Sequence, residues 1–202
     1  MARKRVSRMT RDQWLALARK RDVRERITQD QDMADFQSVI RSVSRRGLLD
    51  WDEAVALLHM VYGWMPTMLR ATTIDRTDER SRLVAILNEA RRNVLQDKRD
   101  LELVQKFANR SVVGASKLLH VVNPEWYAIW DSRVAQAFLW KGVTLSTYSV
   151  LDRYVEYLAA LREWGEDREV RNQCKEIRAL NPALADAGDI RVIELVLFRA
   201  LK

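Results

Sequence analysis

Lys117 and Asp131 are the residues whose types and spacing point most directly to chemistry. They stand in the segment GASKLLHVVNPEWYAIWDSRVAQ, residues 114–136. Lys117 falls on a short apolar helix, and Asp131 opens the next predicted helix after a proline-containing turn, which is short enough to bring the two side chains together. A free lysine, with a pKa of about 10.4, is almost all ammonium, whereas burial favours the neutral, nucleophilic amine. The spacing therefore raises the question of whether the two residues form a catalytic pair or belong to two helices joined by a turn.

Both residues also have an ordinary structural interpretation. A lysine on a short amphipathic helix is usually a solvated cation. An aspartate before SRVAQ is a common helix N-cap, worth about 1 kcal/mol. From the residues alone, catalysis and these structural roles both stay open.

A glycine-containing turn precedes Lys117. Short helices are predicted at 101–108 and 115–122, on either side of NRSVVG. Backbone N–H groups at such a turn, and at the start of the second helix, can hold a DNA phosphate. The residues predicted to contact DNA are Arg110, Ser111, Gly114, Ser116 and Arg133.

The stretch VVGASKLLHVVNPEWYAIWDSRV resembles the core of the helix–hairpin–helix DNA glycosylases, particularly their 8-oxoguanine glycosylase branch. In that family a hairpin ending in glycine precedes a helix with the catalytic lysine, and an aspartate opens the next helix. The resemblance covers about residues 101–140 and implies that Gly114 belongs to the hairpin, that Lys117 is the nucleophile and that Asp131 is the assisting carboxylate. The family usually has G-V-G-x-K where this chain has V-V-G-A-S-K, and its lysine-to-aspartate interval is several residues longer.

The resemblance implies a DNA base-excision enzyme. Such an enzyme must flip its nucleotide out of the duplex, because the anomeric carbon of the sugar is inaccessible in the stack. We expect a lysine-dependent DNA glycosylase, with or without AP lyase activity, that acts on a damaged base such as 8-oxoguanine or on a modified base in foreign DNA. The residues expected to line the base pocket, each of which can instead belong to the core, are His120, Trp126 and Trp130.

Two other functions fit the same residues. A non-catalytic helix–hairpin–helix DNA-binding protein would use Lys117 only against phosphate. A helical protein-interaction factor would carry its positive charge incidentally. Salt-dependent DNA binding separates the glycosylase and the non-catalytic DNA-binding protein from the protein-interaction factor.

Composition narrows the partners and cofactors. The formal net charge is +7 and the isoelectric point is about 9.8, which favours a polyanionic partner, with nucleic acid ahead of an anionic membrane. Cys174 is the only cysteine and the chain has two histidines, so we expect no disulfide, no metal and no other cofactor. No apolar run approaches the roughly 20 residues of a membrane span, and we expect a soluble, cytoplasmic monomer.

The predicted fold is all-α. Hydrophobic residues make up 48% of the chain, and six glycines and three prolines are few, which favours long helices. About nine or ten helices are expected in one compact domain of one or two lobes at residues 10–202, after a flexible basic arm at 1–9. Thr10, Asp50 and Asp189 are predicted N-caps. Only 141–150 has a strand-like pattern.

Overall fold

A computed structural model of the chain describes residues 8–65, 68–69, 77–94, 96–139 and 150–201. Over these residues it has eleven α-helices, one short 3-10 helix and no strand, which confirms the all-α class and slightly exceeds the predicted number of helices. The strand-like segment lies, except for Val150, outside the described residues. The elements are α1 Arg11–Ala18, α2 Arg21–Thr28, α3 Asp32–Ser44, α4 Trp51–Tyr62, α5 Thr77–Arg91, α6 Lys98–Phe107, α7 Val112–Val122, α8 Ser132–Leu139, α10 Leu151–Glu166, α11 Arg168–Arg178, η1 Pro182–Leu184 and α12 Asp189–Ala200.

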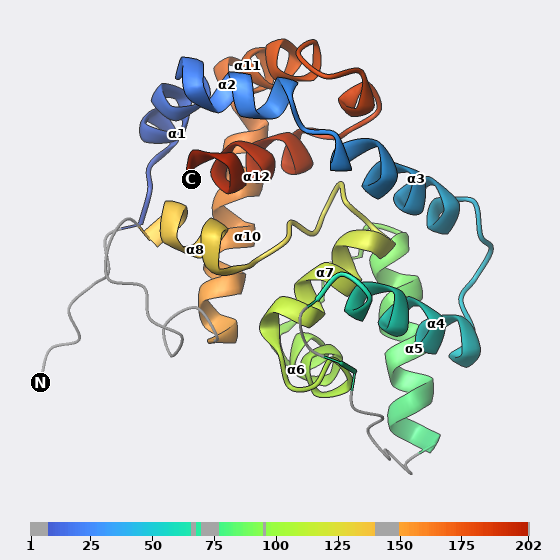
Figure 1. The fold of residues 1–202 in the computed structure, drawn as a ribbon. Helices are drawn as coiled ribbons and strands as arrows, with labels where there is room; N and C mark the ends of the chain where they lie inside the picture. The colour runs from blue at the N-terminus through green and yellow to red at the C-terminus, as the bar shows by residue number, and fades with distance from the viewer. Residues whose placement is uncertain (1–7, 66–67, 70–76, 95, 140–149, 202) are drawn as a thin grey trace, which may run out of the picture.

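The helices form two groups (Figure 1). One group contains α1, α2, α8, α10, α11 and α12, and the other contains α4, α5, α6 and α7. Helix α3 spans them, because it packs against α7 of the second group and against η1, which follows α11 of the first. Since the first and last helices belong to the same group, a single cut in the chain cannot separate the two groups.

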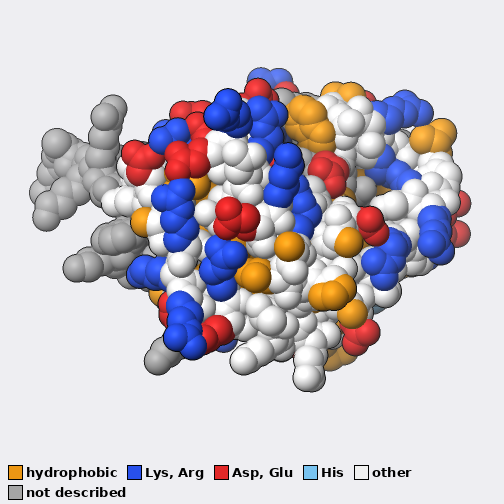
Figure 2. Space-filling model, turned by 90° about the horizontal axis from the view of Figure 1, so that it is seen from above, with side chains coloured by type: hydrophobic (Ala, Val, Ile, Leu, Met, Phe, Trp, Pro, Cys, Tyr) orange, Lys and Arg blue, Asp and Glu red, His pale blue; other side chains and the backbone are white. Residues whose placement is uncertain are grey.

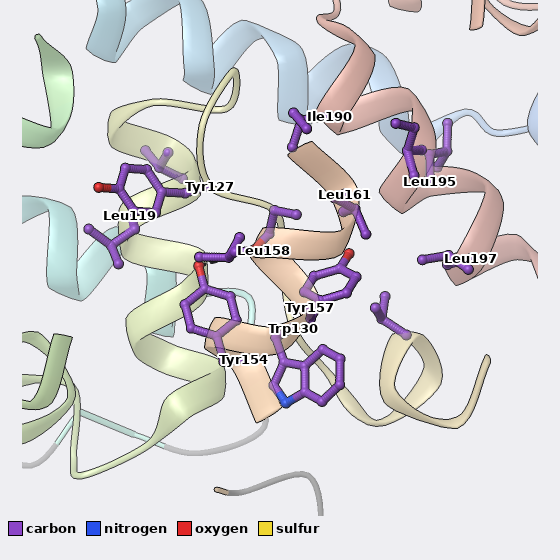
Figure 3. Close-up of a cluster of buried hydrophobic side chains, with 14 of the residues drawn as sticks. Leu119, Tyr127, Trp130, Tyr154, Tyr157, Leu158, Leu161, Ile190, Leu195 and Leu197 are labelled. Atoms are coloured by element: carbon purple, nitrogen blue, oxygen red, sulfur yellow. Dashed lines mark hydrogen bonds between the residues drawn. The ribbon is translucent and has the colours of Figure 1, made fainter. Parts of the chain in front are cut away.

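Helix α10 joins the cores of the two groups (Figure 3). Tyr154 and Leu158 lie on the side of α10 that faces Leu119 of α7, whereas Tyr157 lies against Trp130, with 4.9 Å between the ring centroids. The two tyrosines and Trp130 are fully buried. Aromatic side chains of this size each bury about 150–250 Å². The two groups therefore share one continuous hydrophobic core.

Local capping signals determine where several helices begin. Thr10 forms the predicted capping box, in which the cap side chain and the third helical residue bind each other's backbone N–H. Asp50 is the predicted N-cap of α4, and it too forms a capping box, with Glu53. Asp189 is not an N-cap: α12 begins at this residue after Gly188, and the carboxylate pairs with Arg178 instead, at 2.6 Å. Helix α2 was not predicted, and its N-cap, Lys20, makes no side-chain cap hydrogen bond.

The chain is already part of the core at Met9. This side chain is 3% exposed, and its backbone N–H donates to the carbonyl of Phe138 at 2.6 Å. The predicted arm at 1–9 lies outside the described residues up to residue 7 and does not extend through Met9. None of the described helices combines the length and the apolar character that a membrane span requires.

The turn between α6 and α7 differs from the predicted one. Asn109 and Arg110 occupy the left-handed region, with φ of 51° and 56°, and Ser111 caps α7 by accepting the N–H of Gly114 at 3.1 Å. Helix α7 starts at Val112, so Gly114 lies in its first turn rather than in the connecting turn. The prediction of a glycine turn at this position is therefore wrong.

Gly114 instead allows close packing of α7 against α4. A Cβ at this position would stand 2.6 Å from Tyr62 Oη and 3.2 Å from the Cβ of Ala108. Tyr62 is held in place because its hydroxyl donates to the carbonyl of Ala108 at 2.8 Å. The glycine is thus required by sterics at a helix–helix contact.

We predict that Gly114→Ala lowers the free energy of unfolding by about 1–3 kcal/mol, because the added methyl must displace the Tyr62 hydroxyl. Gly47→Ala is the matched control, since nothing lies within 4 Å of a Cβ there. Urea unfolding of both variants measures the difference. Equal stability of the two variants would refute the steric explanation.

Candidate active site

A cavity of about 340 Å³ lies where α3, α7, α12 and the start of α8 meet. Lys117 and Asp131 both line it, so the structure brings together the two residues that the sequence singled out. The cavity also has aromatic and charged walls, which come from segments far apart in the chain. These walls include Phe36, Trp64, Phe198, Arg191 and Glu194.

Ser116 fixes the segment that carries Asp131. This serine is fully buried, and its hydroxyl oxygen accepts the backbone N–H of Trp130 at 3.0 Å. The hydroxyl also lies 2.9 Å from the carbonyl of Val113, to which it can donate. The segment that ends at Asp131 is therefore tied to α7 at the residue preceding Lys117. Asp131 then caps α8, as predicted, by accepting the N–H of Val134 at 2.9 Å.

Lys117 is a half-buried amine without a close ionic partner. Within the described part of the chain it makes no ion pair shorter than 4.0 Å and no hydrogen bond. Burial lowers the pKa of Lys117 below its ordinary value, while the charges of Asp131 and Glu194 act in the opposite direction. A desolvated amine next to carboxylates that do not neutralise it by contact is suited to nucleophilic attack.

A buried ion pair on α12 forms part of the same wall. Arg191 and Glu194 are 7% and 1% exposed, and the Arg191 guanidinium donates to the Glu194 carboxylate. Burial raises the pKa of Glu194, and the charge of Arg191 opposes this rise. Buried ion pairs rarely add net stability compared with apolar residues of similar volume. The position of this pair on a cavity wall therefore calls for a functional explanation.

Aromatic rings provide flat apolar surfaces around the cavity. The ring centroid of Phe36 lies 5.3 Å from that of Trp64, and the Arg191 guanidinium lies 4.8 Å from the Phe36 ring. Trp64 is 45% exposed, so it stands at the mouth of the cavity. Phe198 lies one helical turn after Glu194 on α12. Arg guanidinium groups lie over the rings of Phe36 and Phe198, whereas the exposed ring of Trp64 can stack on a planar ligand.

The three residues expected to line the base pocket do not line this cavity. Trp130 is fully buried in the core beside Tyr157, and Trp126 packs under the Arg162 guanidinium at 5.4 Å. The segment before α8 is not helical, and within it Ile129 and Asp131 face the cavity while Trp130 between them does not.

His120 supports the cavity wall from behind. Its ring stacks on Phe36 at 5.6 Å, and its Nδ1 lies 2.6 Å from the carbonyl of Tyr127. Burial, followed by the charge of Arg191, holds the pKa of His120 well below its usual value. The ring is therefore neutral, and it positions Phe36 rather than contacting a ligand in the cavity.

The predicted DNA contacts divide into exposed and internal residues. Arg110 is exposed in the left-handed turn, and Arg133 is exposed with its guanidinium 5.2 Å from the Phe198 ring. Gly114 and Ser116 are buried, so the predicted direct phosphate contacts from these two residues are wrong. Ser111 is half-buried and serves as the cap of α7.

The aromatic and charged cavity residues that the sequence did not predict include Phe36, Trp64, Arg191, Glu194 and Phe198. For two of them a signal was present. Apolar residues nearly surround the segment DIRVIELVLFRALK, so its charged residues must be buried or face a cavity. Phe36 and Trp64 gave no such signal, since an aromatic residue at helical spacing usually belongs to the core.

Two further findings bear on function. Among the residues that the structure describes, no group of three His, Cys, Asp or Glu side chains is arranged to hold a metal ion. On the face seen from above, Lys and Arg side chains are distributed among Asp and Glu side chains and do not form one basic patch (Figure 2).

Comparison of the chain with protein-family models, curated proteins and solved structures finds no match.

We predict that Lys117 loses its proton at lower pH than a free lysine side chain, because burial lowers its pKa. Asp131→Asn or Glu194→Gln lowers the pKa of Lys117 further, because each removes a negative charge that stabilises the ammonium form. Reductive ¹³C-methylation followed by NMR titration measures these values, with Lys117→Arg used to assign the signal. A Lys117 signal that titrates at or above the pKa of a free lysine, about 10.4, would be inconsistent with a desolvated amine.

Proposed function

We propose that the protein is a lysine-dependent DNA glycosylase that removes a damaged or modified base from a nucleotide flipped out of DNA. The observation that carries this proposal is the half-buried, ionically unpaired amine of Lys117 on the wall of a cavity that also contains Asp131. The resemblance of VVGASKLLHVVNPEWYAIWDSRV to the glycosylase family supports the same two residues.

The proposed reaction begins when the neutral amine of Lys117 attacks the anomeric carbon of the sugar. The glycosidic bond breaks, and its electron pair leaves with the base, which takes up a proton. The attached nitrogen then loses a proton, the bond between the anomeric carbon and the ring oxygen breaks as the carbon–nitrogen double bond forms, and the ring oxygen takes up a proton to become a hydroxyl, which leaves a Schiff base to Lys117. Hydrolysis of the Schiff base returns the amine, whereas β-elimination from it would cleave the strand as an AP lyase.

Asp131 is suited to stabilise positive charge on the sugar. Its position is set by two contacts, the α8 cap at Val134 and the attachment of the neighbouring Trp130 backbone to Ser116. A carboxylate held in advance near the site where cationic charge develops loses little energy to reorganisation. Asp131 therefore has a catalytic role in addition to its role as a helix cap.

The remaining cavity walls fit a flat, polar ligand such as a nucleobase. Trp64, which is 45% exposed, offers an apolar ring at the cavity. Arg191 offers N–H donors and Glu194 offers acceptor oxygens, and bases carry the complementary groups along their edges. Candidate substrates are 8-oxoguanine and modified bases of foreign DNA.

DNA would reach this cavity from the side of the α6–α7 turn. Exposed Arg110 stands at the turn, and exposed Arg133 stands beside Phe198 at the cavity. The net charge of +7 favours association with a polyanion.

Neither alternative function explains why Lys117 is half-buried or why Arg191 and Glu194 form a buried ion pair beside it. A non-catalytic DNA-binding protein would need Lys117 at the surface, where phosphates are accessible, but the side chain is half-buried. A protein-interaction factor would not require the buried pair of Arg191 and Glu194 beside this amine.

Lys117→Gln is predicted to reduce release of free base from a modified duplex by about 10³-fold or more, because it removes the nucleophile. DNA affinity should change by less than about tenfold, since Lys117 contributes no outer phosphate contact. Base release is measured by chromatography over a panel that contains 8-oxoguanine, uracil and hydroxymethylcytosine. Lys175→Gln, an exposed lysine on α11, is the matched control.

Asp131→Ser separates the catalytic role of Asp131 from its capping role. Serine caps helices about as well as aspartate but carries no charge. We expect base release to fall by about 10²-fold, with the free energy of unfolding changed by less than about 0.5 kcal/mol. Full activity in Asp131→Ser would leave the residue as a helix cap only.

A further inference from the structure

A second cavity, of about 430 Å³, lies beside the first. It is bounded by the later turns of α3, the end of α5, the segment after α7 and the start of α12. Met33 and Phe36 of α3 line the first cavity, whereas Gln37 and Arg41, further along the same helix, line the second. Arg191 lines both cavities. The proposed base excision makes no use of the second cavity.

Three residues around the second cavity have buried N–H groups without a hydrogen-bond acceptor among the described residues. These groups are Gln37 Nε2, Arg91 Nη1 and Arg191 Nε. Gln37 is only 6% exposed as a whole residue. A buried donor without a partner costs about 1–3 kcal/mol, and native structures contain few of them. Their concentration at one cavity indicates a ligand rich in acceptor oxygens.

The charges around the cavity favour an anion that also carries donors. Arg41, Arg91 and Arg191 face the cavity from α3, α5 and α12. Glu125 and Asp186 are the carboxylates among the residues that line it. Guanidinium groups bind phosphate through paired N–H donors, and carboxylates accept from hydroxyl or amino groups. A nucleotide carries both kinds of group in one molecule.

We propose that the second cavity binds a nucleotide, with its phosphate on Arg91 and Arg41 and with its sugar hydroxyl or base amino groups toward Glu125. The nucleotide can be a free mononucleotide or one unit of a DNA strand, since both present the same chemistry. The volume of about 430 Å³ accommodates one such unit.

Arg191 couples the two cavities. Its guanidinium is already bound to Glu194 in the first cavity. A phosphate on Arg91 and Arg41 that also accepts from Arg191 competes with Glu194 for this guanidinium, so occupancy of one cavity alters the polar wall of the other. Only this coupling depends on the proposed glycosylase function, whereas binding to the second cavity does not.

Isothermal titration calorimetry of the full chain with inorganic phosphate, dGMP and a single-stranded DNA 12-mer tests the proposal. We expect dGMP to bind more tightly than phosphate, and Arg91→Gln to weaken its affinity by about tenfold or more, the loss of one charge-assisted contact. Arg41→Gln provides a second test, because Arg41 is exposed and can be replaced without disturbing the core. Arg171→Gln, exposed on α11, is the matched charge control and should bind normally.

Lys117→Gln locates the binding and separates this proposal from the glycosylase proposal. It should abolish base release and leave the affinity for dGMP unchanged. Loss of dGMP binding in Lys117→Gln would assign the nucleotide to the first cavity and overturn the proposal. The proposal also fails if the folded wild-type chain binds no dGMP at millimolar concentration, or if Arg91→Gln and Arg41→Gln bind it as tightly as the wild type. Preference for the 12-mer over dGMP would identify a DNA strand as the source of the nucleotide.

Discussion

The enclosure of charged side chains between two groups of helices is the constraint on which the candidate site depends. Lys117, Asp131, Arg191 and Glu194 surround one cavity, and the last two are almost completely buried. Removing such groups from water costs several kcal/mol per ion. The shared core around α10 must offset this cost, since it ties both groups of helices together. In return, electrostatic interactions inside the cavity are stronger than they would be at the surface.

Three residues of helix α7 position the walls of this cavity: Gly114, Ser116 and Lys117. Gly114 lets the helix approach Tyr62 of α4, and Ser116 holds the backbone of Trp130. Lys117 follows directly and projects into the cavity that Asp131 also lines. Two residues expected to contact DNA are thus internal supports for the two residues expected to perform the chemistry. The absence of a side chain at Gly114 and the buried hydroxyl of Ser116 thus set the position of this cavity wall.

The parts of the structure that depend on neighbouring residues could be predicted from the sequence. The capping boxes at Thr10 and Asp50 and the cap at Asp131 rely on hydrogen bonds that span three positions, and all three form. Lys117 and Asp131 could likewise be paired, because one helix and one turn separate them.

The parts that depend on distant packing could not be predicted. Phe36, Arg191 and Glu194 reach the cavity only after α3 and α12 dock on α7 and α8, and sequence spacing carries no record of this docking. Trp130 was expected in the pocket because its neighbour Asp131 lies there. The non-helical segment turns these two side chains to opposite sides, and its path is set by Ser116, a tertiary contact.

The most direct test of this account is to identify the residue that forms a covalent adduct with DNA. The protein is incubated with duplexes that carry an abasic site or a modified base, reduced with borohydride, digested and analysed by peptide mass spectrometry. We predict an adduct on Lys117 and on no other amine of the chain. An adduct on a different lysine or on the amino terminus, or no adduct with any duplex, would contradict the account and return Lys117 to the role of an unreactive cavity residue.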